Sequence, residues 1–267
     1  MPADAPTDIS KQTSADPGAC SEDAILGGKL VLRQPRRGHR FGHDAILLAA
    51  AVAARPGEHA VEFGAGVGAA GLALARRVEG LDVTLVELDP ALSSLAAENA
   101  NRNGLSARVR AVCLDVRAPD AAFTASGLVL AAADHVLMNP PFNTAQNPSP
   151  DAMRRAAHVG SDRMLGQWLD AAARLLRPGG AVTLIWRADG LTEVLAALAA
   201  GFGAITVLPV HGKIGSPAIR VVVRAIKASN APLALLPGFA LADSGGKPTV
   251  AAETVMRDGA ALPLLRS

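Results

Sequence analysis

The stretch Val61-Glu62-Phe63-Gly64-Ala65-Gly66-Val67-Gly68 decides the fold of this chain. Residues typical of a buried strand come first, three glycines follow at alternate positions, and an Ala- and Leu-rich segment that predicts a helix comes after them. Glycines let a backbone approach a ligand closely, and the free N–H groups of a helix N-terminus attract polar groups. The stretch therefore predicts a strand, a small-molecule site and a helix, in that order.

Beyond this stretch, short apolar runs alternate with helix-like segments. Strands are predicted at 60–63, 83–87, 109–114, 136–139 and 182–186, with helices up to residue 78, over 90–103 and over about 161–176. Short continuous apolar runs are typical of strands buried on both faces of a parallel sheet. Two last runs, 204–210 and 218–226, are joined by too few residues for a crossover helix, so they are predicted to be antiparallel. The fold class is α/β: a doubly wound, mostly parallel seven-stranded sheet with an antiparallel last strand.

Three further segments surround this sheet. Residues 1–21 are polar and without periodicity, which predicts a disordered leader. Residues 22–57 predict a small N-terminal hairpin and helix, and residues 58–230 hold the alternating pattern of the main domain. Residues 231–267 are punctuated by Pro and Gly and are expected to form a C-terminal extension.

Composition excludes several classes of protein. Hydrophobic residues make up 50% and charged residues 19%, so the chain can bury a core and wholesale disorder is excluded. The longest apolar run, 45–54, is far shorter than the roughly 20 residues of a membrane span, and the N-terminal residues lack the apolar segment of a secretion signal. Cys20 and Cys113 are too few for a disulfide framework or a cysteine-rich metal site. We expect a cytoplasmic protein without a metal.

Three acidic residues at the ends of predicted strands narrow the ligand of the glycine loop. Glu62 precedes the loop and can reach a cationic amino-acid group, while Glu87 lies about 20 residues further on, where such folds hold a ribose. Asp115 ends the third strand and can accept a hydrogen bond from an adenine amine. S-adenosylmethionine carries all of these groups. The candidate cofactor-binding residues are Glu62, Gly64, Gly66, Gly68, Glu87, Asp115 and Asn139.

The glycines leave one alternative open. The string Gly66-Val-Gly68-Ala-Ala-Gly71 also has the GxGxxG spacing of a dinucleotide site, which would indicate an NAD(P)-linked oxidoreductase. The pyrophosphate of NAD would be repelled by the Glu62 carboxylate. S-adenosylmethionine is therefore the favoured cofactor.

A second motif, Asn139-Pro140-Pro141-Phe142, follows the fourth predicted strand. It lies at the carboxyl edge of the sheet, where α/β folds place their ligands. Prolines have no N–H donor, so their carbonyls remain acceptors beside the Asn139 side-chain oxygen, and such acceptors suit an NH2 group. Phe142 can stack on a planar base, a contact worth about 1–3 kcal/mol. Asn139, Pro140 and Phe142 are the candidate catalytic residues.

These motifs together resemble the class I S-adenosylmethionine-dependent methyltransferases, and Asn-Pro-Pro-Phe resembles the motif of members that methylate planar nitrogens. The resemblance implies that Asn139 and the Pro140 carbonyl hold the target NH2 group while Phe142 stacks on the base. It also implies a Rossmann-like sheet and no metal in the reaction.

A closer resemblance, over about residues 24–240, is to the bacterial tRNA1(Val) (adenine-N6)-methyltransferases. It is carried by Phe41-Gly-His-Asp-Ala-Ile-Leu-Leu48, by residues 149–158 and by Pro209-Val-His-Gly-Lys213. It implies methylation of adenine N6 in tRNA. Asn143 departs from the family, which usually has an aromatic residue at this position.

Three other functions stay open. The first two are methylation of guanine N2 in ribosomal RNA and methylation of glutamine N5 in release factors, because enzymes with these activities share the Asn-Pro-Pro-aromatic motif. The third is a non-catalytic RNA-binding module with a vestigial cofactor pocket.

An RNA partner requires a local basic surface, because the net charge of +2 is too small for the whole molecule to act as a polycation. The densest basic cluster consists of Arg33, Arg36, Arg37 and Arg40. These side chains are candidate phosphate contacts. A solvated hairpin without a partner is the alternative.

Overall fold

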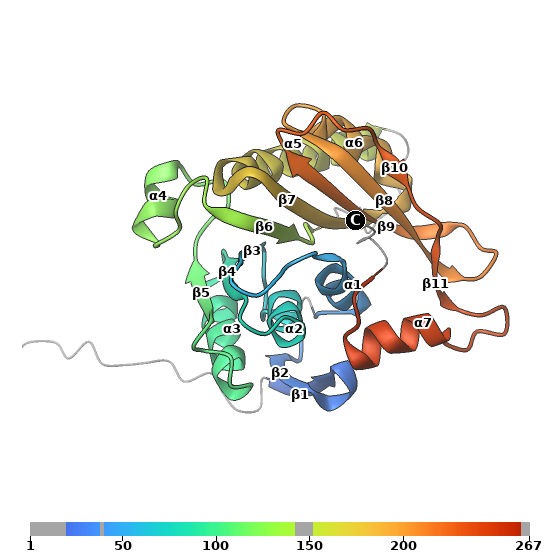
Figure 1. Ribbon diagram of the computed structural model, residues 1–267, viewed down its shortest axis with the longest axis horizontal. Helices are drawn as coiled ribbons and strands as arrows, with labels where there is room; N and C mark the ends of the chain where they lie inside the picture. The colour runs from blue at the N-terminus through green and yellow to red at the C-terminus, as the bar shows by residue number, and fades with distance from the viewer. Residues whose placement is uncertain (1–19, 38–39, 142–151, 263–267) are drawn as a thin grey trace, which may run out of the picture.

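A nine-stranded sheet lies at the centre of the computed structural model (Figure 1). The structure describes residues 20–37, 40–141 and 152–262, and for residues 152–163 it describes the backbone alone. The order is β10-β8-β9-β7-β6-β3-β4-β5, and β11 also pairs with β8. The strands are β3 (His59–Phe63), β4 (Asp82–Glu87), β5 (Val109–Cys113), β6 (Ala133–Met138), β7 (Leu176–Arg187), β8 (Phe202–Lys213), β9 (Ala218–Lys227), β10 (Ala234–Leu235) and β11 (Phe239–Ala242). Strand β9 is antiparallel to β7 and β8, and all other pairs in this sheet are parallel. The predicted α/β sheet with an antiparallel last strand is confirmed.

The sheet has two strands more than the seven predicted. Both additional strands, β10 and β11, lie in the predicted C-terminal extension and pair in parallel with β8. They are only two and four residues long, and Pro237 and Gly238 lie between them, so they carry no periodic signal. The segment after residue 230 is therefore part of the main sheet and its edge.

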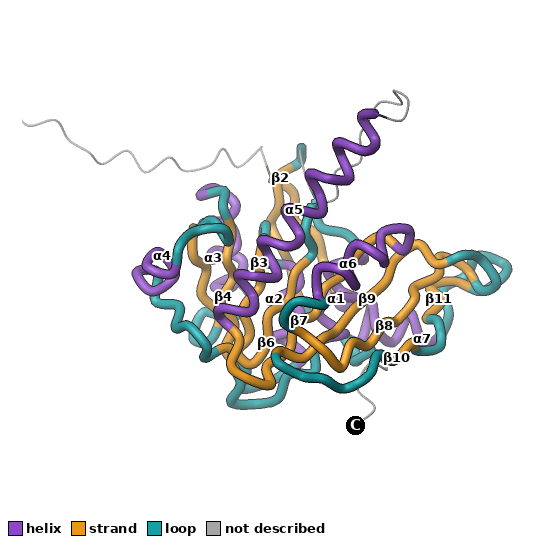
Figure 2. Tube along the Cα trace, turned by 90° about the horizontal axis from the view of Figure 1, so that it is seen from above, coloured by secondary structure: helices purple, strands orange, loops and turns teal. Residues whose placement is uncertain are grey.

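Helices cover both faces of the sheet, as Figures 1 and 2 show. One buried cluster joins a sheet face to α1 (His43–Ala51), α2 (Ala69–Arg77) and α3 (Pro90–Arg102). The other joins the opposite face to α4 (Asp120–Ala125), α5 (Ala152–Leu175) and α6 (Leu191–Leu198). The short helices α4 and α6 were not predicted, and α5 begins well before residue 161, its expected start. None of the described helices is long and apolar enough to cross a membrane.

The predicted N-terminal hairpin is present. Strand β1 (Cys20–Ile25) pairs antiparallel with β2 (Leu30–Pro35), and the turn η2 (Leu26–Gly28) joins them. The hairpin thus starts at Cys20, slightly before the predicted end of the leader, while residues 1–19 lie outside the described part. At the other end of the chain, α7 (Val250–Glu253) and the π-helical turn η4 (Thr254–Asp258) pack beside α1 and η2 (Figure 1).

Candidate active site

The two predicted motifs meet at the carboxyl edge of the sheet. Phe63, the last residue of β3, is the cross-strand partner of Met138, the last residue of β6. The glycine loop (residues 64–68) and Asn139 therefore follow directly from two paired positions. Parallel pairing thus brings together residues that are about 75 positions apart in sequence, as expected for a ligand site in an α/β sheet.

The three loop glycines all have positive φ, but they face different surroundings. A Cβ on Gly64 would lie 2.6 Å from Trp168 Cη2, and a Cβ on Gly68 would lie 2.9 Å from Leu85 Cδ1. A Cβ on Gly66, where φ is 56°, would meet no atom of the described residues within 4 Å. Packing inside the protein therefore explains Gly64 and Gly68, whereas Gly66 is the position at which the loop offers open space to a ligand.

Glu62 lies under the start of α2. Its residue is only 5% exposed, and its Oε2 accepts a hydrogen bond of 2.7 Å from the Gly71 N–H. Burial raises the pKa of Glu62 to about 8, because the charged form loses its hydration. The carboxyl is thus mostly protonated at neutral pH, and a nearby cation would favour its ionised form.

Glu87 connects the end of β4 to the glycine loop. Its Oε2 accepts from Gly66 N–H at 2.7 Å and its Oε1 accepts from Asp89 N–H at 2.9 Å. Each carboxylate oxygen can accept a further hydrogen bond. Glu87 can therefore shape the loop and still bind ribose hydroxyls.

Asp115 has a partner that the sequence did not indicate. The Arg117 guanidinium donates to it twice, at 3.0 Å from Nε to Oδ1 and at 2.7 Å from Nη2 to Oδ2. These hydrogen bonds hold the pKa of Asp115 below its usual range. Both side chains are partly exposed. An adenine amine would thus share this carboxylate with Arg117.

Asn139 is half-buried, yet its Oδ1 is fully buried and has no hydrogen-bond partner among the described residues. An unsatisfied buried acceptor costs about 1–3 kcal/mol, so this atom is suited to an incoming N–H donor. Pro140 is buried beside it, and the two prolines supply no backbone donor. The third predicted catalytic residue, Phe142, lies outside the described residues.

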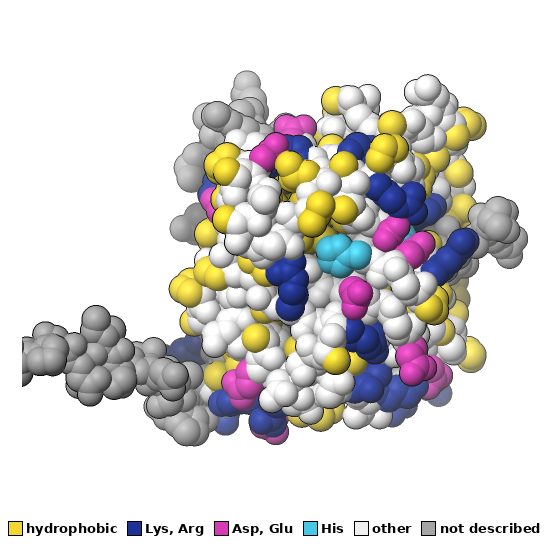
Figure 3. Space-filling view, turned by 60° about the vertical axis from the view of Figure 1, so that its left-hand side comes forward, with side chains coloured by type: hydrophobic (Ala, Val, Ile, Leu, Met, Phe, Trp, Pro, Cys, Tyr) yellow, Lys and Arg dark blue, Asp and Glu magenta, His cyan; other side chains and the backbone are white. Residues whose placement is uncertain are grey.

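The four arginines of the predicted basic cluster differ in their surroundings. Arg33 forms an ion pair with Glu98 (2.6 Å) and Arg40 forms one with Asp23 (2.9 Å). Arg36 and Arg37 are exposed, and no carboxylate partner for them exists among the described residues. On the face that Figure 3 shows, basic and acidic side chains are interspersed and form no single positive patch. Arg36 and Arg37 are thus the members of the cluster with charge available for a phosphate.

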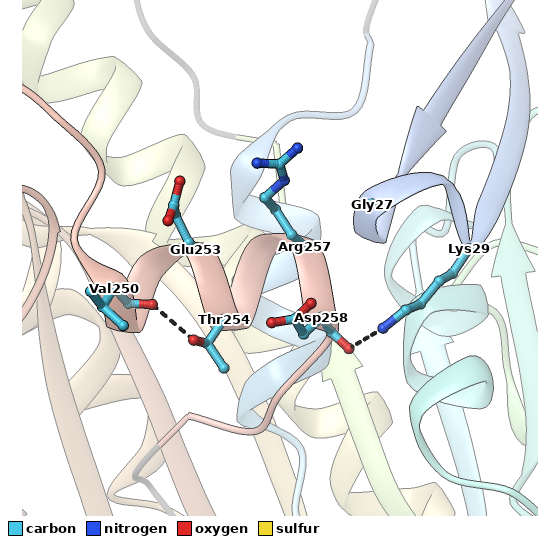
Figure 4. Close-up of a pocket in the computed structure, with 7 residues that line it drawn as sticks. All are labelled: Gly27, Lys29, Val250, Glu253, Thr254, Arg257 and Asp258. Carbon is cyan, nitrogen blue, oxygen red and sulfur yellow. Dashed lines mark hydrogen bonds between the residues drawn. The ribbon is translucent and has the colours of Figure 1, made fainter.

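A pocket of about 440 Å³ lies elsewhere, between the hairpin turn η2 and the C-terminal turn η4 (Figure 4). The Lys29 side chain extends along one side of this pocket, and its Nζ donates to the Asp258 carbonyl at 2.9 Å. None of the predicted site residues lines this pocket. Among the described residues no group of three His, Cys, Asp or Glu side chains could hold a metal ion.

The family model of the methyltransferase small domain matches residues 40–214, more than half of the chain. The chain belongs to this family. The match includes the glycine loop, all three acidic residues and Asn139, so the protein is an S-adenosylmethionine-dependent methyltransferase. The NAD(P)-linked oxidoreductase is thereby excluded.

Curated relatives named tRNA1(Val) (adenine(37)-N6)-methyltransferase are similar to this chain. The protein from Tolumonas auensis is 28% identical over 169 residues, which are 63% of this chain and 68% of the relative. The protein from Dickeya chrysanthemi is 30% identical over 158 residues, which are 59% of this chain and 60% of the relative. The similarity therefore spans only about three fifths to two thirds of each relative.

Solved structures share the fold. A predicted O-methyltransferase from Agrobacterium tumefaciens has a TM-score of 0.70 and 29% identity, covering 82% of this chain and 98% of that one. An O-methyltransferase dependent on S-adenosylmethionine from Thermotoga maritima has a TM-score of 0.52 and 18% identity, covering 73% and 69%.

Proposed function

We propose that the protein methylates the exocyclic N6 of an adenine in tRNA. The observation that carries this proposal is the buried Oδ1 of Asn139 at the end of β6, which has no partner within the described part of the chain and lies next to two residues without N–H donors. A planar NH2 group carries two N–H donors, one of which can reach Asn139 Oδ1 and the other the Pro140 carbonyl. The names of the curated relatives support adenine in tRNA as the source of that group.

The residues around the glycine loop would hold the cofactor. We assign Glu62 to the ammonium group, Glu87 to the ribose and Asp115 to the adenine amine, with Gly66 leaving space for the ligand. S-adenosylmethionine supplies a methyl group on a sulfonium sulfur. The loop and these acids fix where that methyl group lies relative to Asn139.

The role of Asn139 and Pro140 is alignment. Two accepted hydrogen bonds orient the target nitrogen so that its lone pair faces the methyl group, and proximity of this kind is a large part of catalysis. The same two oxygens stabilise the positive charge that develops on the nitrogen as the bond forms. We expect Phe142 to stack on the base.

The RNA would reach this edge of the sheet past the N-terminal hairpin. The end of β2 and the start of α5 both extend from the molecule on the same side (Figure 2). Arg36 and Arg37 directly follow β2 and would contact phosphates there. We therefore assign residues 22–57 to the substrate, residues 58–230 to the methyltransferase domain, and the reaction to the cytoplasm, where tRNA is found.

The test compares three acceptors with labelled S-adenosylmethionine: bulk tRNA, ribosomal RNA and a release factor. We expect label in tRNA and N6-methyladenosine after nucleoside analysis. Label in guanine N2 of ribosomal RNA, or in glutamine of the release factor, would show that this acceptor is the substrate and would refute adenine in tRNA.

The matched variants are Asn139→Ala and Asn101→Ala, the latter an exposed amide on α3. Asn139→Ala should lower kcat at saturating cofactor by about 100-fold or more, the usual effect of removing one transition-state hydrogen bond. Asn101→Ala should behave as wild type. Full activity of Asn139→Ala would refute the assignment.

A further inference from the structure

Asn99 of α3 joins two segments that are far apart in the sequence. The residue is fully buried. Its Oδ1 accepts from the Arg33 N–H at 2.8 Å, and its Nδ2 donates to the Arg33 carbonyl at 2.9 Å and to the Val67 carbonyl at 3.0 Å. Arg33 lies on β2 of the N-terminal hairpin, and Val67 lies in the glycine loop. One side chain therefore bonds both segments through their backbones.

Asn103 makes similar contacts one helical turn later. Its Oδ1 accepts from the Val31 N–H at 3.0 Å, and its Nδ2 donates to the Val31 carbonyl at 2.9 Å. Four helical residues rise about 6 Å and two strand residues span about 6.6 Å, so the two amides match alternate residues of β2. The two amides thus make the hydrogen bonds that a neighbouring strand would make to the open edge of β2. Strand β2 packs against α3 (Figure 1).

Only one of the two amides reaches the glycine loop. Asn103 Nδ2 donates its other hydrogen bond to the Asn99 carbonyl within the helix (2.8 Å), whereas Asn99 Nδ2 donates to Val67. The two residues thus share their contact with the hairpin and differ in their contact with the loop.

The Val67 carbonyl lies at a sensitive place in the loop. It belongs to the peptide that joins Val67 to Gly68, and both flanking glycines, Gly66 and Gly68, have positive φ. Gly68 N–H, on the other side of the same planar peptide, donates to the Ala65 carbonyl at 2.8 Å. Asn99 therefore adds a second hydrogen bond, on the carbonyl side, to a peptide whose neighbouring glycines permit several backbone conformations.

We propose that Asn99 is a positioning residue for S-adenosylmethionine. It holds the glycine loop in its binding shape by connecting Val67 to the N-terminal hairpin. The inference rests on the proposed role of the loop in cofactor binding. This role also explains why a polar side chain, the Asn99 amide, lies on the buried face of α3.

Two variants separate this role from simple anchoring of the hairpin. Asn99→Ser and Asn103→Ser each remove two hydrogen bonds to β2, and only Asn99→Ser removes the bond to Val67. Calorimetry should show that the Kd for S-adenosylmethionine rises about 3- to 10-fold for Asn99→Ser, the range that one lost hydrogen bond produces. For Asn103→Ser the Kd should change less than about 2-fold. At saturating cofactor, kcat should stay near the wild-type value in both.

Gly66→Ala tests the loop site itself, since the new methyl group would meet no atom of the described residues within 4 Å and the φ of 56° also strains an alanine in the binding shape of the loop. If Gly66→Ala weakens binding while Asn99→Ser does not, the role of Asn99 is refuted and the site stands. If neither weakens binding, the proposed loop site fails as well. Equal weakening by Asn99→Ser and Asn103→Ser would show that hairpin anchoring, and not the Val67 bond, is responsible.

A measurement on the wild-type protein keeps the inference testable if Asn99→Ser does not fold. The side-chain amide resonances of Asn99 and Asn103 can be followed by NMR, with Asn103→Ser providing an assignment. Addition of S-adenosylmethionine should shift the Asn99 resonance much more than that of Asn103. An Asn99 resonance that stays unchanged at saturation would refute the role.

Discussion

Gly64 and Trp168 approach so closely that a Cβ on Gly64 would lie 2.6 Å from Trp168 Cη2. Gly64 begins the loop after β3, and Trp168 is a buried residue of α5. The indole also meets Phe63 edge-on, with ring centroids 6.3 Å apart and an interplanar angle of 88°. The missing side chain of Gly64 thus allows α5 to pack directly on the end of β3.

We expect Gly64→Ala to destabilise the protein. The Trp168 ring would have to move, at a cost of about 1–3 kcal/mol for an overpacked site, and alanine at a φ of 62° adds roughly 1–2 kcal/mol. The control is Gly57→Ala, because Gly57 also has positive φ but has open space around its Cβ position. Urea unfolding should show the larger loss for Gly64→Ala. Equal losses would mean that Trp168 adapts without cost.

The placement of the glycine loop and Asn139 at one edge of the sheet could be predicted from the sequence. Alternating strands and helices produce parallel strands with right-handed crossovers, so all of their carboxyl ends lie at one edge. The strand order of the structure, in which β3 pairs with β6, then places Gly64 and Asn139 side by side. Side-chain detail is not needed for that conclusion.

The partners of the charged residues could not be predicted in this way. The pairing of Asp115 with Arg117 depends on a local turn, and that of Arg33 with Glu98 on how the hairpin packs against α3. Asn99 left a weak signal: two amides four residues apart, Asn99 and Asn103, lie on one face of an Ala-rich helix. The partners of these amides are in distant segments, so only the folded structure identifies them.

Binding of S-adenosylmethionine should release a proton from Glu62. Burial raises the pKa of this carboxyl to about 8 in the free protein, so it is mostly protonated at pH 7. An ammonium group beside it favours the ionised form and lowers the pKa. The proton then leaves, and affinity should rise as the pH increases from about 6 to 8.

Calorimetry in two buffers of different ionisation enthalpy measures this proton. At pH 7 we expect release of up to about one proton per cofactor, and a clearly smaller release for Glu62→Gln, which cannot ionise. Identical proton release by the two proteins would place the ammonium group away from Glu62.

Arg36 and Arg37 should contribute to the salt dependence of RNA binding. Each phosphate contact contributes a log–log slope of about −0.7 to −0.9. Replacing both arginines with alanine should therefore reduce the magnitude of the slope by about one to two units and weaken binding to all RNA sequences. Cofactor affinity should not change.

Filter binding from low to high salt gives these slopes. The control is Arg55→Ala, an exposed arginine just before β3 and so at the opposite edge of the sheet. A wild-type slope in the double variant would show that the turn after β2 is only solvated and that RNA binds another surface.

Cys113 provides a reporter for the adenosine half of the site. It is the last residue of β5 and the cross-strand partner of Glu87, it is exposed, and it precedes Asp115 by two residues. If the ribose binds Glu87 and the adenine amine binds Asp115, the bound cofactor covers this thiol. Alkylation requires access to the thiolate. S-adenosylmethionine should therefore slow the reaction of Cys113 with N-ethylmaleimide at least several-fold.

The Cys20→Ser variant makes Cys113 the single thiol of the chain, so that one rate is measured. Protection should follow cofactor concentration with the Kd found by calorimetry, and it should disappear in urea, where the site is absent. Adding Gly66→Ala to the same background should shift protection to higher cofactor concentration without changing the rate of the free protein. A Cys113 rate that is unaffected by saturating cofactor would mean that the adenosine lies away from Glu87 and Asp115, and both assignments would then be withdrawn.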